Sequence, residues 1–116
     1  LLDSPHPKGD LLGVARIAGI QGAKRTSEWI PLCHPLPLDK VDVTLARDGE
    51  DRIRIVCTAS ATARTGVEME SIVGAAAAAT TLYDMCKSAS KGIVLERIRL
   101  LSKTGGKSGD WQAAGG

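Results

Sequence analysis

Apolar and polar residues alternate in two neighbouring stretches near the middle of the chain. Over residues 40–46 and again over residues 53–59, apolar side chains occupy every second position. An alternation with a period of two is typical of strands that bury one face. The polar run Arg47–Asp51, which includes Gly49, separates the two stretches and is typical of a turn. The pattern therefore predicts a β-hairpin.

Helical spacing of apolar residues marks one segment before this hairpin and one after it. Asp10 can serve as the N-cap of a helix that we predict over residues 11–25. Thr65 and Glu68 fit a capping box at the start of a long, alanine-rich helix that we predict over residues 67–88. Apolar side chains occupy two sides of this second helix, which is typical of a helix covered on both sides. We expect another subunit to supply the second cover.

The remaining segments complete the predicted fold. Residues 31–38 contain three prolines and should be extended, residues 93–101 should form a last strand, and the glycine-rich tail over about 103–116 should be loop-like. The order helix, strand, strand, helix, strand is the ferredoxin-like pattern without its first strand. We therefore expect one α+β domain over residues 1–116, a ferredoxin-like antiparallel sheet with two helices on one face, whose first strand is missing from this chain. The alternative is a bare three-stranded sheet with two helices on one face.

Composition narrows the class of protein. Of the 116 residues, 43% are hydrophobic, and 15 basic side chains nearly balance 13 acidic ones. These values exclude a disordered chain and argue against a general binder of nucleic acid or membranes. Two Trp, one Tyr and no Phe also argue against the RNA-binding sheets that stack bases. No signal peptide or membrane-spanning run is visible, and because the chain does not start with Met we expect it to be part of something longer.

The cysteines give no sign of a cross-linked or metal-bound scaffold. Cys33, Cys57 and Cys86 are odd in number and far apart, and none belongs to a CxxC pair. A disulfide framework and a structural zinc site are therefore both unsupported. We expect reduced, cytoplasmic chemistry and no metal among the site residues.

Asp84 and Lys87 are the first candidates for chemistry. They stand three positions apart on the second predicted helix, so their side chains can touch. Lys87 follows Met69 by a whole number of helical turns, which puts it on the centre of an apolar face. A partly buried lysine has a lowered pKa and can exchange protons near neutral pH, with Asp84 holding it. An exposed ion pair of little energetic value is the alternative.

Other candidates are weaker when each is taken alone. The Glu70 carboxylate suits a pair of donors such as the N1/N2 edge of a guanine. Prolines around His34 fix its backbone and so position its side chain, whereas the adjacent Cys33 has no Asp or Asn placed to complete a Cys–His nucleophile. Lys8, at the positive end of the first helix, points to a shared anion such as phosphate. Lys103 is either a phosphate contact or part of a solvated tail.

Spacing along the second helix limits how these residues can cooperate. Glu70 and Asp84 are 14 residues apart, or roughly 21 Å at the rise of an α-helix. One small substrate can hardly touch both within one chain. If both belong to active sites, each pocket is best built from two chains.

Six ordered blocks resemble one known family. They run from Lys8 to near Trp111, so the resemblance covers nearly the whole chain. Together they resemble the cyclic pyranopterin monophosphate synthase family (molybdenum cofactor biosynthesis protein C family). The blocks are KGD at residues 8–10, ARIAGIQGAKRT at 15–26, PLCHPLPL at 31–38, TGVEME at 65–70, YDMCK at 83–87 and GGKSGD at 105–110.

The resemblance implies an activity and an assembly. The activity is that of a lyase in molybdenum cofactor (molybdopterin) biosynthesis. It converts (8S)-3′,8-cyclo-7,8-dihydroguanosine 5′-triphosphate to cyclic pyranopterin monophosphate with release of diphosphate. The resemblance also implies a ferredoxin-like fold, dimers assembled into a homohexamer, active sites at the dimer interface, and no metal or organic cofactor.

The resemblance assigns roles to residues as well. The active-site aspartate of the family matches Asp84, and its catalytic lysines match Lys8 and Lys87, with general acid and base roles not divided between the two. We expect the family's N-terminal segment to be missing from this chain. Its substrate-binding positions match Leu32, Cys33, His34, Glu68, Met69, Glu70 and Lys103.

Two rival functions come from other classes of protein. A non-catalytic, oligomeric nucleotide-binding module of ferredoxin-like shape equally explains the doubly apolar helix and the basic residues. Such a module does not require an inward-facing Lys87 or a fixed His34, and tight nucleotide binding without turnover would favour it. RNA binding is the third reading, and the shortage of aromatic residues and the near-neutral charge disfavour it.

Overall fold

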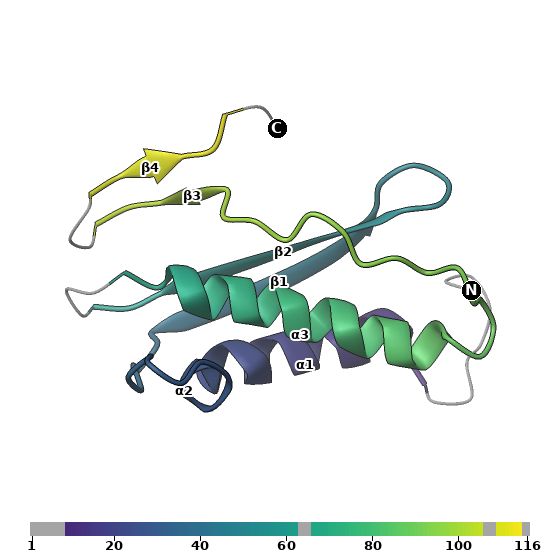
Figure 1. Cartoon of the computed structure of the whole chain (residues 1–116), viewed down its shortest axis with the longest axis horizontal. Helices are drawn as coiled ribbons and strands as arrows, with labels where there is room; N and C mark the ends of the chain where they lie inside the picture. Colours follow the sequence, from purple (N-terminus) through teal and green to yellow (C-terminus); the bar gives the residue numbers. More distant parts are fainter. Residues whose placement is uncertain (1–8, 63–65, 106–108, 115–116) are drawn as a thin grey trace.

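Two long helices lie side by side against one face of a β-hairpin (Figure 1). The computed structural model describes residues 9–62, 66–105 and 109–114. The class is α+β, as predicted. The described elements are α1 (Leu11–Lys24), α2 (Thr26–Trp29), β1 (Lys40–Arg47), β2 (Ile53–Ser60), α3 (Glu68–Cys86), β3 (Ser102–Lys103) and β4 (Trp111–Gln112).

The hairpin confirms the prediction from alternation. β1 and β2 pair antiparallel with Lys40 opposite Ser60 and Arg47 opposite Ile53. Val43 points toward the helices and is fully buried, whereas its neighbour Thr44 is exposed. The polar face of the hairpin therefore meets solvent and the apolar face meets α1 and α3.

Small residues allow α1 and α3 to approach closely. A Cβ added to Gly19 would lie 3.0 Å from the carbonyl oxygen of Gly74, and one added to Gly22 would lie 2.6 Å from the Cβ of Ala77. Neither position therefore has room for a side chain. The alanine-rich sequence of α3 thus serves a tight helix–helix contact, and this contact fixes where the two ends of α3 lie.

The start of α3 differs from the predicted capping box. The helix begins at Glu68, and Val67 is its N-cap residue without a side-chain hydrogen bond. Thr65 lies outside the described residues. A backbone bond from the Ser71 amide to the Val67 carbonyl (3.1 Å) already opens the helix at this point, so the predicted box with Glu68 at its third position is wrong. Asp10 is the N-cap residue of α1, as predicted, but its side chain makes no capping bond.

The predicted last strand over residues 93–101 is also wrong. Within the part of the chain that the structure describes, this segment joins no sheet, and only Ser102–Lys103 pairs with β4. The physical reason is that a strand requires backbone partners along its length; at the end of this segment the Ala113 amide donates to the Leu101 carbonyl at 2.7 Å, beside the β3–β4 pair. The tail, expected to be loop-like, contains the short β3–β4 pair. None of the helices described has the length and apolarity needed to cross a membrane.

Candidate functional site

The predicted site residues lie at the two ends of α3. Glu68 and Glu70 occupy its first turn, whereas Asp84 lies in its last turn and Lys87 is its C-cap residue. The rise of an α-helix separates Glu70 from Asp84 by roughly 21 Å. One chain therefore carries two separate groups of candidate residues, as the spacing predicted.

The C-terminal group is an exposed ion pair. The Nζ of Lys87 donates to Oδ1 of Asp84 at 2.8 Å, and the two side chains are 58% and 56% exposed. The hydrogen bond and the negative charge of Asp84 raise the pKa of Lys87. The prediction of a partly buried lysine with a lowered pKa is thus wrong for the single chain. The reason is that Lys87 is the C-cap residue, at the very end of α3, where its side chain projects into solvent.

The start of α1 lies at the same end of the molecule. Leu11 packs against Met85 and Cys86 in one buried cluster, which Leu82 and Ile93 border. Gly9 and Asp10 precede Leu11 directly, so the KGD block leads into this end. Lys8 itself lies outside the described residues.

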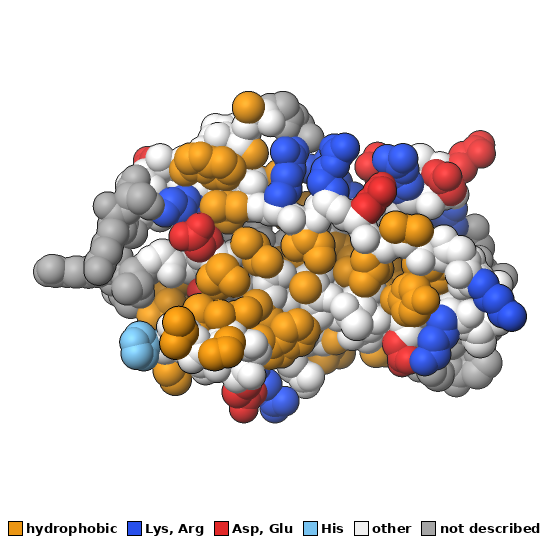
Figure 2. Space-filling model, in the orientation of Figure 1, with side chains coloured by type: hydrophobic (Ala, Val, Ile, Leu, Met, Phe, Trp, Pro, Cys, Tyr) orange, Lys and Arg blue, Asp and Glu red, His pale blue; other side chains and the backbone are white. Residues whose placement is uncertain are grey.

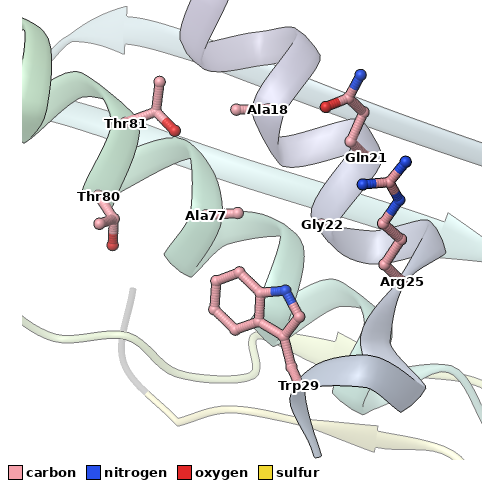
Figure 3. Close-up of a pocket in the computed structure, with 8 residues that line it drawn as sticks. All are labelled: Ala18, Gln21, Gly22, Arg25, Trp29, Ala77, Thr80 and Thr81. Atoms are coloured by element: carbon pink, nitrogen blue, oxygen red, sulfur yellow. The ribbon is translucent and has the colours of Figure 1, made fainter.

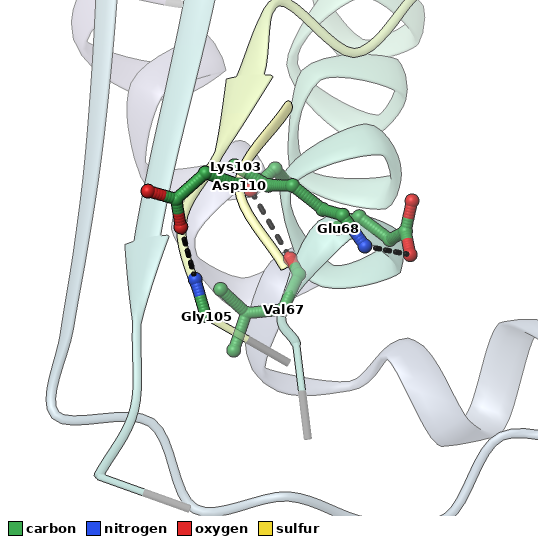
Figure 4. Close-up of polar contacts among 6 residues, drawn as sticks. Val67, Glu68, Lys103, Gly105 and Asp110 are labelled. Carbon is green, nitrogen blue, oxygen red and sulfur yellow. Dashed lines mark hydrogen bonds and ion pairs between the residues drawn. The ribbon is translucent and has the colours of Figure 1, made fainter. Parts of the chain in front are cut away.

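The N-terminal group centres on Lys103 of β3 (Figure 4). Its Nζ lies 3.7 Å from Oε1 of Glu68, and its side chain is only 15% exposed, against 45% for Glu68. The Gly105 amide donates to Oδ1 of Asp110 at 3.0 Å, which closes the turn between β3 and β4. Lys103 is thus a mostly buried cation paired with Glu68 beside the first turn of α3. The alternative that Lys103 belongs to a solvated tail is wrong.

Glu70 differs from Glu68 in its exposure. Its residue is only 6% exposed, because it lies on the side of α3 that also buries Val73 and Ala77. Met69, between the two glutamates, is half-buried. Within the single chain, Glu68 is therefore the more accessible of the two carboxylates.

The proline-rich loop lies at the N-terminal end of α3 as well. α2, which precedes the loop, contacts α3, and the Asp39 amide, which follows it, donates to the Ser60 carbonyl at 2.8 Å. Both ends of the loop are therefore held near the strand end that leads into α3 (Figure 1). Leu32 and His34 are exposed and Cys33 is half-buried. The fold thus places these three predicted substrate-binding residues at the same end as Glu68 and Lys103.

A hollow that no sequence motif indicated lies on the outer side of the helix pair (Figure 3). It has a volume of about 250 Å³ and is lined by residues of α1, α2 and α3, with the indole of Trp29 at one side. Its polar groups come from Gln21, Arg25, Thr80 and Thr81. Arg25 belongs to the sequence block at 15–26, but a run of neighbouring residues gives no sign of a hollow that three helices form together.

A comparison with models of known protein families matches this sequence to one family. The model described as the MoaC family matches residues 1–106, which include both groups of candidate residues at the ends of α3. The match extends across α1, the hairpin, α3 and β3, so it covers most of the chain. The chain therefore belongs to the MoaC family, and its role lies in molybdenum cofactor biosynthesis.

Proposed function

We propose that this chain is a lyase that converts (8S)-3′,8-cyclo-7,8-dihydroguanosine 5′-triphosphate to cyclic pyranopterin monophosphate and diphosphate. Opening the purine five-membered ring, closing the new ring and cyclising the phosphate all require proton transfer. Side chains that donate and accept protons suit these steps.

The observation that carries the proposal is the division of candidate residues between the ends of α3. The Asp84–Lys87 pair and the Glu68–Lys103 pair are each partly open to solvent, yet roughly 21 Å of helix lies between the two groups. Each proposed pocket therefore combines the C-terminal group of one copy with the N-terminal group of a second copy. Dimers of this kind would assemble into the proposed hexamer.

The two ion pairs support different roles for the residues of such a pocket. Because Asp84 raises the pKa of Lys87, Lys87 enters the reaction as an ammonium and acts as a general acid or as a partner for phosphate charge. Lys103 provides a second cation for the triphosphate, positioned by Glu68. Lys8 is the remaining proposed catalytic group. Leu32, Cys33, His34, Met69 and Glu70 are proposed to contact the purine-derived part of the substrate or its phosphates.

A lysine substitution with a matched control tests the chemistry. We expect Lys87→Gln to lower product formation from the cyclised triphosphate by about 100-fold or more, while the far-UV circular dichroism stays unchanged because the side chain is exposed. Lys91→Gln, an exposed lysine four positions later, should retain activity. A folded Lys87→Gln chain with full product formation would remove Lys87 from the mechanism.

Mixing two inactive variants tests the shared pocket separately. Lys87→Gln disables one group and Lys103→Met the other, so a one-to-one mixture of refolded chains contains hybrid dimers with one intact pocket. Random pairing would restore about a quarter of the unmutated activity per chain. If the mixture stays inactive while it forms hybrid dimers, the pocket does not combine the two groups. If the cyclised triphosphate binds tightly but is not turned over by any form, the nucleotide-binding rival replaces the enzyme.

A further inference from the structure

Asp39 connects the proline-rich loop to the hairpin by two hydrogen bonds. Its amide donates to the carbonyl of Ser60, the last residue of β2, at 2.8 Å. Its carboxylate accepts a hydrogen bond of 2.5 Å from the hydroxyl of Thr62, which lies 23 positions later. Bonds from a hydroxyl to a carboxylate are short and about twice as strong as bonds between neutral groups. Asp39 thus joins the end of the loop to the end of β2 and to the chain that follows it.

The segment between His34 and Asp39 is stiff, because prolines restrict it. Pro35 and Pro37 each fix their own φ, and each restricts the residue before it to extended backbone. Within the described part of the chain, residues 34–38 form no backbone-to-backbone hydrogen bond. A stiff segment transmits the position of its anchored end, so the bonds of Asp39 determine where His34 lies.

The chain around Thr62 belongs to a tightly packed part of the molecule. β2 lies so close to α3 that a Cβ added to Gly74 would be 2.5 Å from Sγ of Cys57. Thr62 follows the end of β2 directly, and the next helix along the chain, α3, begins at Glu68. The bond between Asp39 and Thr62 therefore ties the loop to the packed pair of elements that carries Glu68.

Packing contributes little to holding the loop itself. Leu32 and His34 are exposed. His34 is the one histidine in the described part of the chain, and Figure 2 shows a histidine side chain at the surface near one end of the molecule. The start of the loop has a bond from the Cys33 amide to the Ile30 carbonyl at 3.1 Å, which closes a local turn and reaches no other element. Since a segment with few buried contacts is ordered by its hydrogen bonds, the anchor at Asp39 decides how well the loop is ordered.

We propose that Asp39 is a positioning residue, which through its bond to Thr62 holds residues 32–34 at a fixed place relative to Glu68 before substrate binds. The assignment of these residues to the substrate rests on the proposed function, whereas the ordering of the loop does not. A loop that already occupies its binding position requires no ordering when the substrate arrives. Because the loop would contact the bound substrate and the transition state alike, loss of its order raises KM and leaves kcat nearly unchanged.

Two measurements on threonine variants of the full chain test the proposal. Thr62→Val removes the hydroxyl with little change of shape, Thr62→Ser keeps it, and Thr44→Val removes the hydroxyl of an exposed threonine on β1 as a control. In Thr62→Val we expect the NMR order parameters of the amides of residues 32–34 to fall from about 0.85 to below about 0.6, with those of α3 unchanged. If the loop then occupies its binding position about a tenth of the time, KM for the cyclised triphosphate rises about tenfold, while kcat changes less than about twofold. Thr62→Ser and Thr44→Val should behave like the unmodified chain.

A folded Thr62→Val chain in which the order parameters or KM stay unchanged overturns the proposal. An equal loss in Thr62→Ser or Thr44→Val also overturns it, because the effect then does not come from the hydroxyl that binds Asp39. A lower kcat at unchanged KM places the bond in the chemical step and overturns the positioning role. If Thr62→Val does not fold, Asp39→Ala, which removes the acceptor and keeps the amide bond to Ser60, is measured against the same criteria.

The order parameters separate this proposal from the proposed function. If the unmodified chain forms no product, the proposed function fails, and the order of residues 32–34 in Thr62→Val alone decides whether Asp39 positions the loop. If the unmodified chain forms product and Thr62→Val changes neither the order parameters nor KM, Asp39 has no positioning role and the proposed function stands.

Discussion

The close contact between Gly22 and Ala77 allows us to predict how much an added methyl group at Gly22 lowers the free energy of unfolding. In an exposed helix, replacing glycine with alanine stabilises by about 1 kcal/mol. At Gly22 the added methyl would lie 2.6 Å from the Cβ of Ala77, and neither carbon can rotate away because both are attached to backbone. The helices must separate, and overpacking of this kind costs about 1–3 kcal/mol or more. We expect Gly22→Ala to lower the free energy of unfolding by about 2 kcal/mol.

Gly13 is the matched control in the same helix. A methyl at Gly13 would meet only the carboxylate of Asp10, at 2.5 Å from Oδ2, and this exposed side chain can turn into solvent. Gly13→Ala should therefore stabilise by about 0.5–1 kcal/mol. For a chain of this size, about 4 °C in Tm corresponds to 1 kcal/mol. Thermal unfolding should thus show Gly22→Ala roughly 8 °C below the unmodified chain and Gly13→Ala a few degrees above it.

A double-mutant cycle isolates the steric cause. In a chain that already carries Ala77→Gly, the opposing methyl is gone, so adding Gly22→Ala should be neutral or stabilising. The coupling energy between the two positions should be about 2 kcal/mol. A Gly22→Ala chain as stable as Gly13→Ala, or a coupling energy below about 0.5 kcal/mol, would refute the reasoning that these helices are in limiting contact.

Three further predictions concern single side chains. Val43→Ala should cost about 2–3 kcal/mol by denaturant unfolding because the side chain is fully buried, whereas Val94→Ala, at an exposed position, should cost almost nothing; equal costs would contradict the assigned core. Asp84→Asn should return the raised pKa of Lys87 toward its ordinary value in an NMR titration of Nζ. The ion pair stabilises the fold at pH values below the ordinary pKa of lysine, and this stabilisation is lost as the pH rises through the raised pKa of Lys87. A Lys87 titration that is the same with and without Asp84→Asn would show that the ion pair does not form. Burial raises the pKa of Cys57 to about 11, so in a chain whose other cysteines are serine, thiol labelling should keep accelerating from pH 9 to 11, and a plateau near pH 9 would contradict it.

Local patterns predicted the elements whose stability depends on their own residues. The alternation over 40–46 and 53–59 specified the hairpin because a period of two leaves one face apolar in any register that the turn permits. The prolines of 31–38 excluded a helix there, and the apolar spacing located α1 and α3 to within two residues at each end. The separation of Glu70 from Asp84 followed from the helical rise alone.

The positions of side chains relative to a second element could not be predicted in the same way. Lys87 shares a helix face with Met69, but which face of α3 meets the core depends on the glycines of α1 opposite it. The same packing buried Glu70 and left Glu68 accessible. The hollow beside Trp29 depends on three helices at once. Such features arise from contacts between distant parts of the chain, which periodicity does not encode.

Residues 93–101 illustrate the difference between what local sequence predicts and what tertiary contacts decide. By itself, the sequence determined that this segment is suited to a strand, that the hairpin and two amphipathic helices exist, and that the order of elements is ferredoxin-like. Only the tertiary structure decided that residues 93–101 belong to neither described sheet, because a strand forms against a neighbour's backbone. Local preference therefore specifies an element, whereas hydrogen-bonded neighbours and packed faces decide whether and where it forms.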